Sequence, residues 1–184
     1  MRIIAGSAGG IRLECPDGIA RPMMDRVRGA VFSSLGDAVD GARVADLFSG
    51  SGALGIEALS RGATSCTFVD IHRKAGHAIR ENLGRAKLSG TVRQQDVAAF
   101  VAGSAEASFD LVFADPPFAL ALEDKAHPVS LMHSGSLGHC LAPGGIFVVE
   151  LPVEPPPGDG AWELLRCRAY GQAWVAFYRR RPDA

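Results

Sequence analysis

The four residues Asp115, Pro116, Pro117 and Phe118 form the most distinctive chemical string in this chain. Two consecutive prolines fix φ and remove two backbone donors, so the turn presents rigid carbonyl groups. A carboxylate and a fixed carbonyl can accept the two protons of an amine on a nucleic-acid base, which frees the nitrogen lone pair for attack on a methyl donor. Phe118 can stack on the base. We therefore predict that all four residues form a catalytic loop for amine methylation.

A glycine-rich turn between a strand and a helix at residues 46–55 supplies a second candidate site. Glycines allow a ligand to approach the backbone, and the first amides of a helix are free donors. The expected cofactor contacts here are Asp46, Phe48, Ser49, Gly50 and Gly52. The segment also satisfies GxGxxG, so a dinucleotide site is the alternative. Asp46 would repel a pyrophosphate but accept hydrogen bonds from the cationic amino acid moiety of S-adenosylmethionine, which favours that cofactor.

Two further acids end predicted strands, at Asp70 and Asp96. The ends of parallel strands meet at one edge of a sheet, where ligands bind in doubly wound folds. We expect Asp70 to accept the ribose hydroxyls of the cofactor, a role common to NAD and S-adenosylmethionine sites. We expect Asp96 to reach the adenine amino group. Each of these carboxylates can also cap the helix that follows it.

Short apolar runs alternate with longer helical patterns from residue 43 onward, which predicts an α/β fold with a mostly parallel sheet. The expected strands are 43–48, 66–70, 91–95, 109–114 and 145–151, and the expected helices are 53–60, 73–87, 97–102 and 131–141. Residues 162–170 and 173–180 predict a closing antiparallel hairpin joined at Gly171. Ahead of this core we expect a small β-hairpin, then a helix that Asp25 caps and that runs to about Leu35.

The length of 184 residues fits one methyltransferase domain, with residues 1–42 as an extension of a core at 43–184. No apolar run approaches the roughly 18 residues that span a membrane, and no signal peptide is evident, so we expect a cytoplasmic protein. No cluster of His and Cys has the spacing of a metal site. Residues 1–34 carry five Arg against three acidic residues, and residues 161–184 carry five against two, so the basic ends could form a phosphate-binding surface.

The combination of motifs resembles a known family, the bacterial 16S rRNA guanine-N2 methyltransferases. The resemblance is carried by residues 2–6, 21–28, 46–62, 115–118 and 170–171. It implies the seven-stranded class I methyltransferase sheet with an antiparallel last strand, S-adenosylmethionine as cofactor, and the N2 of a guanine in 16S rRNA as target, in free RNA or in the assembling small ribosomal subunit. It also implies that the segment with Arg21 and Asp25 closes over the cofactor and faces RNA.

The chain departs from this family at two places. Residues 7–10 read Ser-Ala-Gly-Gly where the family usually has Lys or Arg, and residues 23–24 are Met-Met where it usually has small hydroxyl residues. Three alternatives stay open: an adenine-N6 methyltransferase acting on DNA or RNA, an NAD-dependent dehydrogenase or dinucleotide-binding domain, and an RNA-binding assembly factor without catalysis. We expect a monomer that needs no metal.

Overall fold

The computed structural model describes residues 1–15, 23–117 and 128–181. Seven strands form one sheet in the order β3-β2-β1-β4-β5-β7-β6. β7 runs antiparallel to both of its neighbours, whereas the other pairs are parallel. The strands are β1 (Arg43–Leu47), β2 (Ser65–Asp70), β3 (Thr91–Gln94), β4 (Phe109–Ala114), β5 (Leu141–Leu151), β6 (Trp162–Tyr170) and β7 (Ala173–Arg180). This order and direction confirm the predicted class I methyltransferase sheet.

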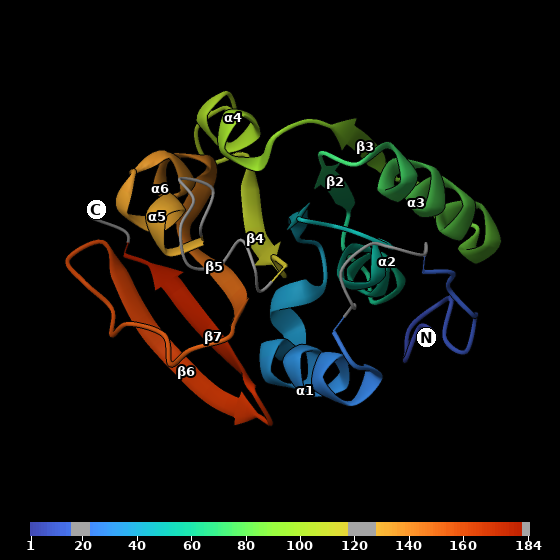
Figure 1. Cartoon of the computed structure of the whole chain (residues 1–184), viewed down its shortest axis with the longest axis horizontal. Helices are drawn as coiled ribbons and strands as arrows, with labels where there is room; N and C mark the ends of the chain where they lie inside the picture. The colour runs from blue at the N-terminus through green and yellow to red at the C-terminus, as the bar shows by residue number, and fades with distance from the viewer. Residues whose placement is uncertain (16–22, 118–127, 182–184) are drawn as a thin grey trace.

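Helices cover both faces of the sheet (Figure 1). The first face carries α1 (Asp25–Leu35), α2 (Ala53–Ser60) and α3 (Arg73–Ala86), and the second carries α4 (Val97–Ala102), α5 (Pro128–His133) and α6 (Ser136–Cys140). Along β4, Leu111 and Phe113 enter the core on the first face, while Val112 and Ala114 enter the core on the second. Both faces of the central strands are therefore buried, as expected for parallel strands between helix layers.

Helix α2 is buried on every side, because all eight of its residues are buried and the seven apart from Gly55 are each at most 8% exposed. It packs on β2 and β1, and its residue Glu57 receives hydrogen bonds from the N-terminal segment. The Glu57 carboxylate accepts from the amides of Ile4 at 2.7 Å and Ala5 at 3.1 Å. A neighbouring glycine, Gly6, adopts φ +83°, and a Cβ atom there would lie 1.8 Å from the Ser60 carbonyl oxygen. Residues 4–6 are thus clamped against the end of α2.

Two details differ from the sequence-based expectation, and a third, the N-terminal hairpin, is confirmed. The helix predicted at 131–141 is two short helices, because Gly135 adopts φ 74° between α5 and α6, and β5 begins at Leu141. The predicted N-terminal hairpin is present in a short form, with one antiparallel bridge between Arg2 and Arg12 and backbone hydrogen bonds that join residues 1–3 to residues 10–13. Asp25 does not cap α1: Met24 is the N-cap residue and makes no side-chain cap, and Asp25 instead pairs with Arg28 at 3.0 Å.

No helix in residues 1–15, 23–117 and 128–181 combines the length and the apolarity that crossing a membrane requires.

Candidate active site

Four carboxyl groups follow or end neighbouring strands at one edge of the sheet: Asp46, Asp70, Asp115 and Glu150. All four point toward the α1, α2 and α3 face, because side chains alternate along a strand. The residues next to them point into the core of the opposite face, and they are Ala45, Leu47, Val69, Ala114, Val149 and Leu151. Of the three acids that the sequence placed at one edge, Asp70 and Asp115 lie there together with Asp46 and Glu150, whereas Asp96 lies at the exposed start of α4.

The glycine turn after β1 has three residues in the left-handed region: Phe48 at φ 57°, Gly50 at φ 53° and Gly52 at φ 78°. This conformation is costly for a bulky residue such as Phe48 and is typical of functional sites. Gly52 leads directly into α2, and a Cβ atom there would press on Ile79 at 3.2 Å. The turn therefore brings bare backbone to the acidic edge.

Asp46 lies beneath this turn and is almost fully buried. One of its carboxylate oxygens accepts a hydrogen bond from the Gly55 amide at 2.9 Å. Burial raises the pKa of Asp46 well above its usual range; the Gly55 amide lowers this pKa, and the nearby Asp115 and Asp70 carboxylates raise it further. An ionised Asp46 is thus stabilised by any cation that enters the site.

Asp70 holds the glycine turn with one carboxylate oxygen: Oδ2 accepts from the Gly50 amide at 2.9 Å. The other oxygen, Oδ1, accepts from the His72 amide at 2.8 Å and lies 2.9 Å from the His72 ring nitrogen Nδ1. A carboxylate oxygen has more than one lone pair, so these bonds leave acceptor capacity for a hydroxyl group. Asp70 does not cap α3, whose N-cap residue is His72.

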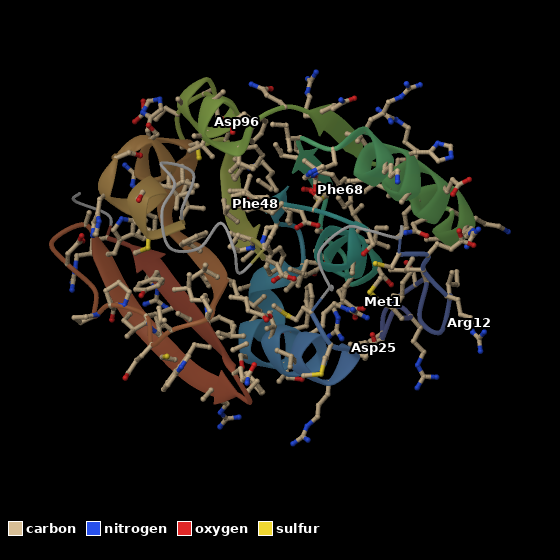
Figure 2. All side chains as sticks on the ribbon, viewed as in Figure 1. Met1, Arg12, Asp25, Phe48, Phe68 and Asp96 are labelled. Atoms are coloured by element: carbon tan, nitrogen blue, oxygen red, sulfur yellow. The ribbon has the colours of Figure 1, made fainter. Side chains whose placement is uncertain are left out.

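Two of the predicted cofactor contacts, Ser49 and Asp96, have side chains that already make hydrogen bonds within the protein. The Ser49 hydroxyl donates to the Asp46 carbonyl at 2.5 Å and accepts from the Val69 amide at 2.7 Å, so it ties β1 to β2. Asp96 caps α4, accepting from the Ala99 amide at 2.8 Å, and its side chain lies at the solvent-exposed start of that helix (Figure 2). Ser49 can therefore offer a ligand little beyond its backbone, while Asp96 lies two residues after the end of β3 and is exposed.

Asp115 begins the predicted catalytic loop directly after β4. Its Oδ2 accepts a hydrogen bond from the Met23 amide at 3.1 Å, which joins the start of the loop to the segment ahead of α1. Burial raises the pKa of Asp115 to about 6, against the Met23 bond, which lowers it. Pro116 is buried and Pro117 is half-buried. Phe118 and Arg21 lie outside the described residues.

Glu150 is a functional candidate that the sequence reasoning missed. It lies one residue before the end of β5 and is 9% exposed. Burial and the neighbouring Asp115 raise the pKa of Glu150 to about 7. The available signal was an acid inside the apolar run at 146–151, where a charged residue in a buried strand calls for an explanation.

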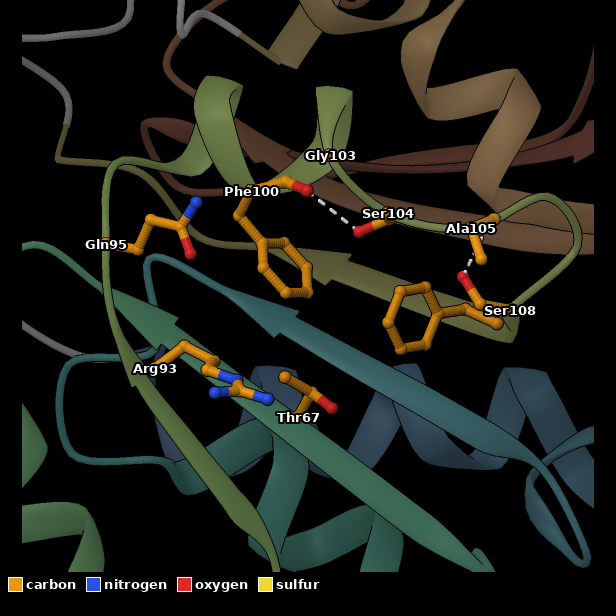
Figure 3. Close-up of a pocket in the computed structure, with 9 residues that line it drawn as sticks. Thr67, Arg93, Gln95, Phe100, Gly103, Ser104, Ala105 and Ser108 are labelled. Carbon is orange, nitrogen blue, oxygen red and sulfur yellow. Dashed lines mark hydrogen bonds between the residues drawn. The ribbon is translucent and has the colours of Figure 1, made fainter.

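A separate pocket of about 350 Å³ lies on the α4 side of the sheet (Figure 3). Phe100 and Phe109 line it together with Arg93 and Thr67, and none of the described residues that line it is acidic. Among those residues the only charged side chain is that of Arg93, a cation, so the pocket suits a cationic ligand poorly. The acidic edge suits one well.

S-adenosylmethionine carries positive charge on its sulfonium and amino groups, and the acidic edge has the complementary properties. Asp46 is a buried acceptor with an elevated pKa, Asp70 retains acceptor capacity, and the glycine turn exposes backbone to a bulky ligand. Within the described part of the chain, no group of three His, Cys, Asp or Glu side chains is arranged to hold a metal ion.

Comparisons with known proteins identify relatives of the whole chain. A family model described as "Conserved hypothetical protein 95" matches residues 1–179. Ribosomal RNA small subunit methyltransferase D of Escherichia coli K12 is 33% identical over 184 residues, covering 98% of this chain and 90% of the relative. A Bacillus subtilis protein provisionally named rRNA methyltransferase YlbH is 37% identical over 188 residues, covering 98% of this chain and all of the relative. A solved Escherichia coli structure, provisionally described as a methyltransferase, is 33% identical with a TM-score of 0.84, covering 99% of this chain and 98% of its own.

Proposed function

The chain belongs to the Conserved hypothetical protein 95 family and is related to ribosomal RNA small subunit methyltransferase D of Escherichia coli, and we propose that it uses S-adenosylmethionine to methylate the N2 of a guanine in 16S ribosomal RNA. The observation that carries the proposal is the position of Asp115. This carboxyl group follows β4, beside Asp46 on β1, and two rigid prolines come after it. An acceptor for an amine thus lies next to the proposed site of the methyl donor.

S-adenosylmethionine supplies an electrophilic methyl group when bound. The chain would hold it with the carboxylates of Asp46 and Asp70 and with the backbone of the glycine turn that includes Phe48, Gly50 and Gly52. Asp96 and the segment with Arg21 and Asp25 are proposed to complete the cofactor site. Arg21 lies outside the described residues, so its part in the site is assigned on the sequence alone.

Asp115 is proposed to accept one N2 proton of the target guanine, and the Pro116 carbonyl the other. Drawing these protons out of the base plane would localise the nitrogen lone pair, so that it could attack the methyl carbon while the bond from that carbon to the sulfonium sulfur breaks and S-adenosylhomocysteine leaves. The nitrogen releases one proton after transfer, and Asp115 is a suitable first acceptor because its pKa is raised to about 6. Pro117 holds the loop rigid, and Phe118 is proposed to stack on the base.

The names of the relatives support an RNA substrate. The Escherichia coli relative is named a small subunit ribosomal RNA methyltransferase. We propose that this chain also acts on small-subunit rRNA, free or in the assembling subunit, as a cytoplasmic monomer. Residues 1–42 are proposed to be an extension of one domain, because Ile3, Val27 and Phe32 share a hydrophobic core with Val44.

The test compares Asp115, which follows β4, with Asp110, which lies near the start of that strand. Asp115→Asn removes the charge at the proposed active site, whereas Asp110→Asn alters a half-buried residue that pairs with Arg43. Each protein is incubated with labelled S-adenosylmethionine and small subunits from a strain that lacks the gene, and the methylated nucleosides are identified by mass spectrometry. We expect N2-methylguanosine with the wild type and Asp110→Asn, and a loss of at least a hundredfold with Asp115→Asn.

The same measurement separates the alternatives. Formation of N6-methyladenosine would indicate the adenine-N6 enzyme. Full activity of Asp115→Asn would overturn the assignment of the catalytic loop. Binding of RNA without any methylated product would indicate an assembly factor. A dinucleotide enzyme is disfavoured by family membership and by the acidic edge, which repels a pyrophosphate.

A further inference from the structure

Glu150 lies beside Asp115 on the adjacent strand. β4 and β5 are parallel, and Ala114 pairs with Val149, so the residue that follows each of these comes next along the same edge. Both side chains point toward the α1, α2 and α3 face, as the alternation along the strands requires. The two carboxyl groups are therefore neighbours at the mouth of the proposed site.

The Glu150 carboxyl group has an unsatisfied oxygen. Oε2 has no hydrogen-bond partner in the protein, and water does not reach it, because the atom is buried in a residue that is only 9% exposed. Burying such an atom without a partner is costly, and native structures contain few cases. Neighbours on β5 and β7 offer it only apolar side chains, including Val148 and Val175. Glu150 Oε2 is therefore suited to accept a hydrogen bond from an N–H or O–H group of a bound ligand.

The sheet order places Glu150 on the substrate side of Asp115. Asp70 and Asp46 lie on β2 and β1, to one side of β4, and Glu150 lies on β5, to the other. The proposed cofactor site uses the β1 and β2 side. A nucleophile must approach the methyl carbon from the side opposite the departing sulfur, so the target base enters from the direction of β5.

The chemistry of the bases makes a second carboxylate selective. On guanine the N1–H donor is adjacent to the N2 amine, so this edge presents donors side by side. On adenine the atom next to the amine is N1, a bare acceptor, and an ionised carboxylate would repel it. A buried carboxylate that faces the N1 acceptor of adenine is left without a donor, so a site built this way strongly favours guanine over adenine.

We propose that Glu150 is a specificity-determining residue that accepts the N1–H of the target guanine while Asp115 binds the adjacent N2 amine. The inference rests on the proposed guanine-N2 activity and deepens it. It assigns to Glu150 the choice of base, and to Asp115 the activation of the nitrogen.

The experiment crosses two enzymes with two substrates. The enzymes are the wild type and Glu150→Gln, which keeps the shape of the side chain but can turn its amide N–H toward an acceptor. The substrates are 16S rRNA fragments that carry at the target position either guanine or 2-aminopurine. The analogue keeps the 2-amino group, but its N1 is an acceptor and carries no hydrogen. The measured quantity is kcat/KM for methylation of the 2-amino group.

The wild type should prefer guanine strongly over 2-aminopurine. Glu150→Gln should lose about tenfold to a hundredfold on guanine, the usual effect of removing a charged hydrogen bond, and little or nothing on 2-aminopurine. The ratio between the substrates should therefore fall by at least tenfold. The affinity for S-adenosylmethionine, measured by calorimetry, should stay within twofold, and Glu163→Gln, at a half-buried position near the start of β6, should behave as the wild type.

An equal loss on both substrates would overturn the inference, because a structural role for Glu150 affects them alike. A large loss of S-adenosylmethionine affinity would also overturn it and would place Glu150 in the cofactor site. If the wild type does not methylate guanine N2 at all, the proposed function itself fails, and that outcome is recognised from the wild-type measurement alone.

Discussion

Replacing Gly55 with alanine tests the packing that holds the glycine turn beside the acidic edge. A Cβ atom at this position would lie 2.4 Å from Phe68 Cε1 and 2.6 Å from Cys66 Sγ. An ordinary carbon contact is about 3.5–4.0 Å, so a neighbour must move by more than 1 Å. Phe68 is fully buried, and overpacking of this kind costs about 1–3 kcal/mol. The better helix propensity of alanine offsets about 1 kcal/mol of that cost. We expect a net destabilisation of up to about 2 kcal/mol.

Gly84 provides the matched control. It lies on the exposed side of α3, and a Cβ atom there would have no neighbour within 4 Å. Gly84→Ala should therefore stabilise the protein by about 0.5–1 kcal/mol. The two substitutions should differ in sign when the free energy of unfolding is measured by urea denaturation.

Gly55→Ala should also weaken S-adenosylmethionine binding in calorimetry, because the amide of Gly55 donates to Asp46. A Gly55→Ala protein as stable as the wild type, with unchanged affinity, would refute the described contact of α2 with β2.

Three further substitutions test other parts of the structure. Glu57→Ala removes the acceptor for the Ile4 and Ala5 amides and leaves the buried Arg28 without its 3.7 Å partner, so unfolding measurements should show a loss of about 3–5 kcal/mol; stability equal to the wild type would contradict the clamp. The effect of Glu150→Gln on the free energy of unfolding should depend on pH. The folded pKa of Glu150, about 7, lies above the ordinary 4.5, so the folded state loses stability as pH rises between these values. The variant should be more stable than the wild type by about 1–2 kcal/mol at pH 8, after allowance for solvent screening, and equal to it near pH 4. A difference in stability that does not change with pH would contradict the raised pKa of Glu150. Asp96→Ala should destabilise the protein by about 0.5–2 kcal/mol through the lost cap, while Asp96→Ser keeps a cap. If Asp96→Ser binds S-adenosylmethionine as tightly as the wild type, Asp96 does not belong to the cofactor site.

In the segments with the clearest apolar periodicity, the sequence predicted the bounds of the helices and strands correctly. The ranges expected for α2, α4, β4, β6 and β7 agree with the structure at both ends. In these segments the apolar pattern, the turn residues and the final burial all favour the same element. The convergence of Asp70 and Asp115 also followed from the pattern, because parallel strands carry their ends to one edge.

The remaining features depend on contacts between distant segments. Glu150 was missed because both faces of β5 are buried, so its sequence shows no alternation that would direct attention to one side chain. The use of the Ser49 hydroxyl to join β1 and β2 depends on Val69, which is 20 residues away. The break at Gly135 rests on one residue in the left-handed conformation, and an isolated glycine in a helical pattern is often tolerated.

The environment of α2 has a consequence for sequence variation. A helix with one buried stripe, such as α3, can vary freely along its outer side, but α2 has no outer side. Its residues face the sheet, the N-terminal segment or the start of the glycine turn, so almost any replacement disturbs one of them. A saturation mutagenesis profile should therefore show α2 as an unbroken block of intolerance, and α3 as a pattern with the period of a helix turn.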